Sequence, residues 1–141
     1  VHQDEGFHQH FIDLKAFELS DVVTFHAYCS PERLEKIIEK LKRYDRPILC
    51  TEWMARQVGS RIEDQLPIFH REKIGCYQWG FVNGKTQTHI PWPGLLDQMA
   101  DYSEDSAEWF HDLLKADGTP HAPDEIVLIK TLVGNNPPNV S

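Results

Sequence analysis

Three short segments of the chain are rich in apolar and β-branched residues, and each predicts a strand. They are DVVTFHAY at residues 21–28, PILCTEW at residues 47–53 and IGCYQWGF at residues 74–81. Near-continuous apolar runs of this kind, rather than alternating ones, are typical of strands that are buried on both faces. The pattern therefore predicts three strands inside a covered sheet.

Two helical patterns lie on either side of the first predicted strand, one before it and one after it. Residues 10–19 predict a short helix. Ser30 followed by Pro31 is a strong N-terminal signal for a second helix, because serine caps free backbone N–H groups and proline suits the first helical position. The apolar residues behind this signal recur at helical spacing and predict its buried side: Leu34, Ile37, Ile38 and Leu41.

The rest of the chain gives two further helices and one undecided region. Residues 59–72 have helical spacing, but Pro67 inside them predicts either a kink or two short helices that meet there. Residues 95–122 fit a helix or an extended segment, with a turn at ADGTP. A final helix is expected to begin at Pro123 and Asp124. Its inward side would carry Ile126, Ile129 and Leu132.

The order strand, helix, strand, helix, strand, helix is typical of an α/β fold with a parallel sheet. In such folds the functional residues sit at the carboxyl ends of the strands. The first strand ends in His26 and Tyr28, the second in Glu52 and Trp53, and the third leads through Trp79 into a polar loop. The sequence therefore predicts one rim that carries a carboxylate, an imidazole and several aromatic rings.

Each of these residues taken singly also has a structural interpretation. A glutamate after a strand is more often a helix cap or an ion-pair partner, and a lone histidine or tryptophan is more often part of the core. The combination at three neighbouring strand ends favours a binding site instead. Aromatic rings stack on the apolar face of a sugar, and polar side chains bind its hydroxyl groups.

Composition narrows the classes of partner. The net charge of −8, without any cluster of Lys and Arg, disfavours nucleic acid, because phosphate binding needs clustered cations. There is no apolar run near the roughly 18 residues that a membrane span requires. The three cysteines are an odd number, and we expect them to be free and mostly buried thiols. None of these features indicates a cofactor or a cellular compartment.

The segments DVVTFHAY, RPILCTEWMAR and GCYQWGFVNGKTQTHIPW together resemble a known family. They look like strands six, seven and eight of a (β/α)8-barrel (TIM-barrel) glycoside hydrolase, in the clan whose retaining members place a nucleophilic glutamate at the end of strand seven. The likeness is closest to bacterial cellulase- or xylanase-like proteins. It runs from about Phe11 through Trp92, with a weaker echo in EWFHDLLKADGTPHAPDEI.

The resemblance implies a role for several residues. Glu52 would be the catalytic nucleophile, and His26 and Tyr28 would hold its carboxylate or neighbouring sugar hydroxyls. Trp79 would resemble the strand-eight tryptophan that forms the floor of the subsite beside the cleaved bond. The other substrate-binding candidates on the rim are Trp53, Lys85, Gln87 and Trp92.

The chain departs from the family's pattern at the second catalytic group. Retaining hydrolysis uses two carboxyl groups about 5–5.5 Å apart. In this clan the acid/base glutamate follows an asparagine at the end of strand four, and this chain has no Asn-Glu pair. A complete barrel also takes about 250 residues. The resemblance therefore implies that the single domain over residues 1–141 is the C-terminal portion of a barrel. The sequence of residues 135–141 itself predicts a frayed tail.

A barrel portion of this kind would leave two bare strand edges and an uncovered inner face. We therefore expect a homo-oligomer, or association with the missing N-terminal part of the barrel, and little or no catalysis by this chain alone. The first residue is valine and no leader follows it, so either a leader has been removed or the chain is a piece of a longer one.

Two other kinds of function remain open. His8 and His10 form a His-x-His pair, which on a strand can bind zinc, although no third ligand is evident. Alternatively, the chain is a non-catalytic sugar-binding or assembly module that keeps the aromatic rim and does not depend on Glu52.

Overall fold

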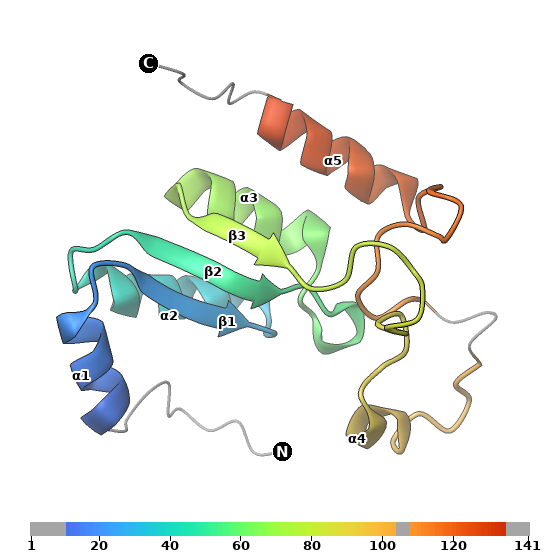
Figure 1. The fold of residues 1–141 in the computed structure, drawn as a ribbon, viewed down its shortest axis with the longest axis horizontal. Helices are drawn as coiled ribbons and strands as arrows, with labels where there is room; N and C mark the ends of the chain where they lie inside the picture. Colours follow the sequence, from blue (N-terminus) through green and yellow to red (C-terminus); the bar gives the residue numbers. More distant parts are fainter. Residues whose placement is uncertain (1–10, 104–107, 135–141) are drawn as a thin grey trace.

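The computed structural model describes residues 11–103 and 108–134, and its centre is a parallel sheet of three strands (Figure 1). The strands are β1 (Val23–Ala27), β2 (Ile48–Trp53) and β3 (Gly75–Gln78), in the order β1-β2-β3. The predicted mixed fold with a parallel three-stranded sheet is confirmed. The His8-x-His10 pair and the predicted tail at 135–141 lie outside the described residues.

Helices alternate with the strands along the chain in the predicted order. Five helices and one 3-10 turn are assigned in the described residues: α1 (Phe11–Leu19), α2 (Pro31–Lys42), η1 (Arg56–Val58), α3 (Ile62–Glu72), α4 (Pro93–Leu96) and α5 (Pro123–Gly134). The predicted N-terminal signal of α2 is confirmed, because Ser30 Oγ accepts a hydrogen bond from the backbone N–H of Arg33 and Pro31 is the first helical residue. The four predicted inward residues of α2 are all buried.

The helix α3 continues through Pro67, so the expectation of two short helices is wrong. Proline at this position removes one backbone hydrogen bond, which normally favours a break. Here the buried side chains of Ile62, Ile68 and Phe69 lie on both sides of Pro67 and fix the helix against the core. Packing thus outweighs the local preference of one residue.

The sheet has one covered face and one open face, which corrects the expectation of burial on both. In β1, Val23, Phe25 and Ala27 are buried within the core cluster that α2 and α3 complete. Thr24 and His26 alternate with them and are exposed. This alternation cannot be recognised from the sequence, because β-branched residues favour strands whether their face of the sheet is covered or open.

The third strand ends at Gln78, three residues before the predicted end. Gly80 leaves the strand with φ of +82°, a conformation that favours glycine. A Cβ atom at Gly80 would lie 2.7 Å from both His111 Cβ and Asp112 Oδ1. Glycine therefore lets the segment around residue 111 pass close to the end of the sheet.

Residues 95–122 are mostly irregular, which resolves the undecided region. Beyond the short helix α4, the described part of this region forms isolated bridges, such as Val82 with Leu114 and Leu114 with Pro120. The predicted turn is present, because Gly118 N–H donates to the carbonyl of Lys115 over 2.9 Å. The final helix begins at Pro123 as predicted, and Ile126 and Ile129 pack against the core.

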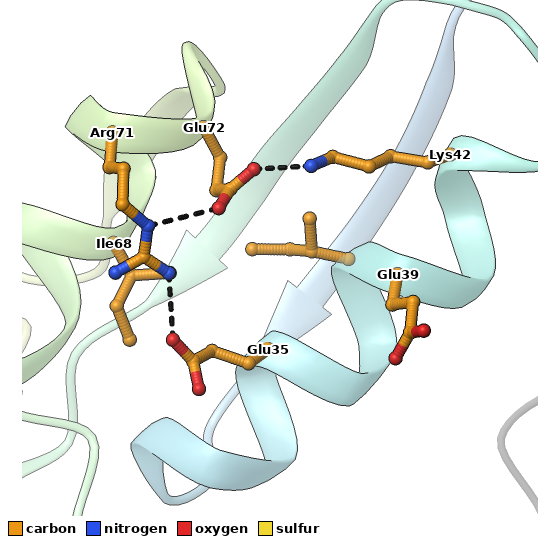
Figure 2. Close-up of a pocket in the computed structure, with 7 residues that line it drawn as sticks. Glu35, Glu39, Lys42, Ile68, Arg71 and Glu72 are labelled. Carbon is orange, nitrogen blue, oxygen red and sulfur yellow. Dashed lines mark hydrogen bonds and ion pairs between the residues drawn. The ribbon is translucent and has the colours of Figure 1, made fainter.

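Ion pairs join the outer surfaces of α2 and α3 around a shallow pocket (Figure 2). Arg71 lies 2.7 Å from Glu35 of α2 and 3.0 Å from Glu72, and Lys42 pairs with Glu72. These charged groups therefore satisfy one another across the two helices. The pocket lies along the contact between the two helices, and these charged side chains already have partners.

A second, buried ion pair connects the end of β2 to α5. Arg56 is 2% exposed, and its guanidinium donates to both carboxylate oxygens of Glu125 over 2.8 and 2.6 Å. The same guanidinium donates to the carbonyls of Trp109 and Asp112. One side chain thus holds the 3-10 turn, the segment at 109–112 and α5 together.

We expect Glu125→Gln to lower the free energy of unfolding by about 3 kcal/mol or more, because it leaves the buried Arg56 without a counter-charge. Denaturant unfolding of the two proteins measures this difference. The matched control is Glu35→Gln, which removes the carboxylate from an exposed arginine pair and should change stability very little. Equal losses in the two variants would contradict the role of Arg56.

Candidate functional site

The carboxylate of Glu52 lies near the carboxyl end of the central strand, and two side chains from the neighbouring strand reach it. Tyr28 Oη donates a hydrogen bond to Glu52 Oε2 over 3.1 Å, and His26 Nδ1 lies 3.4 Å from the same oxygen. The sheet register explains this meeting, since His26 is paired with Glu52 after an irregularity between Phe25 and His26. The structure thus brings together three of the predicted site residues.

Tyr28 is held in its protonated form. Burial of its half-buried ring raises the pKa of the phenol well above its ordinary value, and the hydrogen bond to the Glu52 carboxylate raises it further. A phenol in this state is a hydrogen-bond donor at neutral pH. Tyr28 therefore fixes one oxygen of Glu52, and the carboxylate side chain remains 30% exposed for contact with a ligand.

Aromatic rings form a wall beside this carboxylate. Trp92 packs edge-to-face on Tyr28, with ring centroids 5.2 Å apart, and on Phe110, with centroids 4.8 Å apart. Trp92 nevertheless keeps 43% of its surface exposed. It therefore supports Tyr28 on one edge and offers the rest of its ring to solvent or to a ligand.

His111 belongs to the same wall, and sequence analysis missed it. Its ring lies 5.7 Å from Tyr28 and 5.8 Å from Trp92, and its Nδ1 is 2.5 Å from the carbonyl oxygen of Met54. A carbonyl only accepts, so this contact assigns the proton to Nδ1. Burial lowers the pKa of His111, which keeps the ring neutral.

The remaining predicted rim residues lie in different surroundings. Trp53 is 1% exposed and packs edge-to-face on Phe69, so it belongs to the core and not to the rim. Trp79 follows β3, is 45% exposed, and is tied to β2 by its backbone N–H, which donates to the carbonyl of Trp53. Lys85 and Gln87 are exposed, and no described contact links their side chains to Glu52.

The residue after His111, Asp112, is a further buried polar group. Asp112 is fully buried and accepts a hydrogen bond from Thr88 Oγ1 over 2.6 Å, and its other oxygen lies 4.0 Å from His89 Nδ1. Sequence analysis missed this group too, because it depends on an irregular segment folding back onto the loop after β3. It anchors that segment next to His111.

The described residues do not support two other kinds of site. Within them, no three or more His, Cys, Asp or Glu side chains are arranged to hold a metal ion. The three cysteines are free, as predicted, and burial raises the pKa of the Cys50 thiol to about 12 and that of Cys29 and Cys76 to about 11. Such thiols are poor nucleophiles at neutral pH. No helix in ranges 11–103 and 108–134 is long and apolar enough to cross a membrane.

A scan of the chain against models of protein families, a search of curated proteins and a search of solved structures find no match.

We expect the buried His111 to make stability depend on pH. Its folded-state pKa lies below the unfolded value near 6.5, so the unfolded chain binds the proton first as the pH falls. The free energy of unfolding should therefore decrease as the pH falls below about 7. His111→Asn, which can still donate to the Met54 carbonyl, should make this decrease shallower. Urea unfolding at a series of pH values measures both slopes, and identical slopes would contradict the assignment.

Proposed function

We propose that the chain is the C-terminal portion of a (β/α)8-barrel glycoside hydrolase that acts with retention on β-linked poly- or oligosaccharides. In this proposal β1, β2 and β3 are strands six, seven and eight of the barrel. The observation that carries it is the carboxylate of Glu52, which is partly exposed near the carboxyl end of a parallel strand and accepts a hydrogen bond from Tyr28 over 3.1 Å. The sequence resemblance to that family supports the same assignment.

Glu52 would act as the nucleophile. Its oxygen would attack the anomeric carbon, the bond to the leaving oxygen would break, and a glycosyl ester of Glu52 would form; water would then hydrolyse this ester. A carboxylate must be ionised and oriented for this step. Donation from Tyr28, with His26 at 3.4 Å from the same oxygen, favours the required orientation.

The proton donor would come from another segment. In the described residues the side-chain partners of the Glu52 carboxylate are Tyr28 and His26, and neither is a carboxylic acid. Retaining hydrolysis of an unactivated sugar needs a second carboxyl group about 5–5.5 Å from the first. We therefore propose that the N-terminal part of the barrel supplies it.

The exposed aromatic residues support binding of a sugar. Trp79 and Trp92 are 45% and 43% exposed, and their indole rings are suited to stack on the apolar face of a pyranose. The open face of the sheet also carries Tyr77, which is 63% exposed. This open face favours the second candidate function, a sugar-binding or assembly module that associates with further strands or with another copy of the chain.

The test uses a sugar that needs no acid catalyst. We expect a dinitrophenyl 2-deoxy-2-fluoro β-glycoside to label Glu52, because dinitrophenolate leaves without a proton and the fluorine slows hydrolysis of the glycosyl ester. Mass spectrometry of the protein and of its peptides measures the adduct and locates it. Glucosyl, xylosyl and cellobiosyl reagents cover the expected substrates.

Two variants control this experiment. Glu52→Gln should form no adduct, and Tyr28→Phe should slow labelling by roughly tenfold, because the nucleophile loses the donor that orients it. Absence of any Glu52 adduct across the panel would contradict the nucleophile assignment. Sugar binding detected by tryptophan fluorescence without labelling would favour the non-catalytic module.

A further inference from the structure

Two fully buried polar side chains, Ser60 and Gln65, lie between the ends of β1 and β2. Ser60 Oγ accepts a hydrogen bond from the backbone N–H of Met54 over 3.0 Å. Its own hydroxyl proton is within reach of the Ala27 carbonyl at 3.0 Å and of Gln65 Oε1 at 2.8 Å. Gln65 Nε2 in turn donates to the carbonyl of Cys29 over 2.6 Å.

These contacts hold the backbone on both sides of Tyr28. The carbonyl before Tyr28, that of Ala27, faces Ser60, and the carbonyl after it, that of Cys29, accepts from Gln65. The same Ser60 hydroxyl holds Met54, two residues after Glu52. One buried pair thus links the strand end that carries the phenol to the strand end that carries the carboxylate.

The hydrogen bond from Met54 to Ser60 holds the backbone of Met54 in a conformation that such a residue rarely adopts. Met54 has φ of +76°, in the left-handed region that side-chain-bearing residues rarely adopt. Its N–H is held by Ser60 and its carbonyl by His111. Residues 55 and 60 close the following turn with two reciprocal backbone hydrogen bonds of 2.8 and 3.2 Å. The turn therefore brings Ser60 back to the end of β2.

We propose that Ser60 and Gln65 are positioning residues that hold the Tyr28 hydroxyl on the carboxylate of Glu52. They act through the backbone at Ala27, Cys29 and Met54 and touch neither the carboxylate nor a ligand. Buried polar networks whose members are satisfied rigidify one arrangement of the chain. The inference deepens the proposed function and rests on it, since the position of Tyr28 matters for catalysis only if Glu52 reacts.

The test reads the Tyr28 hydrogen bond directly in the intact chain. Tyrosine labelled with ¹³C at Cζ gives one NMR signal per ring, and the Tyr28 signal is assigned by its loss in Tyr28→Phe. Donation of the phenol proton to a carboxylate moves this signal downfield. Glu52→Gln therefore defines the position of the signal without the charged acceptor.

We expect Ser60→Ala and Gln65→Met to move the Tyr28 signal at neutral pH in the same direction as Glu52→Gln. In the double variant Ser60→Ala with Glu52→Gln, the serine change should add little, because the charged acceptor through which it acts is already absent. The core variant Ile37→Val lowers stability without touching the network and should leave the signal at its wild-type position. Thermal unfolding confirms that each variant is folded.

The outcomes separate the two proposals. If Ser60→Ala and Gln65→Met destabilise the protein but leave the Tyr28 signal unchanged, the pair has a structural role only and the inference is overturned. If Ser60→Ala does not fold, Gln65→Met decides, because methionine nearly matches glutamine in volume. If Glu52→Gln itself leaves the signal unchanged, Tyr28 does not donate to Glu52. The observation that carries the proposed function then fails as well.

Discussion

The parallel pairing of β1 with β2 is the constraint on which the site depends. Parallel strands bring their carboxyl ends to the same edge, so residues after β1 and residues at the end of β2 must meet there. The register pairs Phe25 with Cys50 but His26 with Glu52, so β2 has one extra residue at this point. This irregularity increases local twist and re-aims side chains, and it places Glu52 on the open face beside His26.

Buried polar contacts then tie distant segments to this edge. Arg56 reaches Glu125 and two carbonyls at 109–112, and His111 reaches the carbonyl of Met54. Both contacts are made just after Glu52 in the chain, so the segment that completes the aromatic wall is attached to the strand that carries the carboxylate. Apolar packing alone would not fix the rotation of that segment, because it has little regular secondary structure.

The sequence predicted the elements whose signals are local. The cap at Ser30 and the buried side of α2 follow from spacing within a few residues, and the parallel pairing follows from the alternation of strands and helices. The structure confirms all three. The open face of the sheet was missed because strand-forming residues such as Thr24 do not reveal which face is covered. His111 and Ser60 were missed because their roles depend on partners 57 and 33 residues away. Trp53 was misplaced because a bulge near the strand end reverses which face a residue occupies.

Under the proposed function, the open face of the sheet and the carboxylate of Glu52 would be completed by the same part of the barrel. A parallel sheet is normally covered on both sides, because its crossover helices lie on its faces or its strands close into a barrel. Here the helices α2 and α3 complete the core on one side, and Tyr77 remains 63% exposed on the other. Strands that closed a barrel over this open face would bring their own carboxyl ends to the rim that carries Glu52. In the proposed barrel, the segment that buries the sheet would therefore also be positioned to supply a second carboxyl group, so a single association would complete both the core and the chemistry.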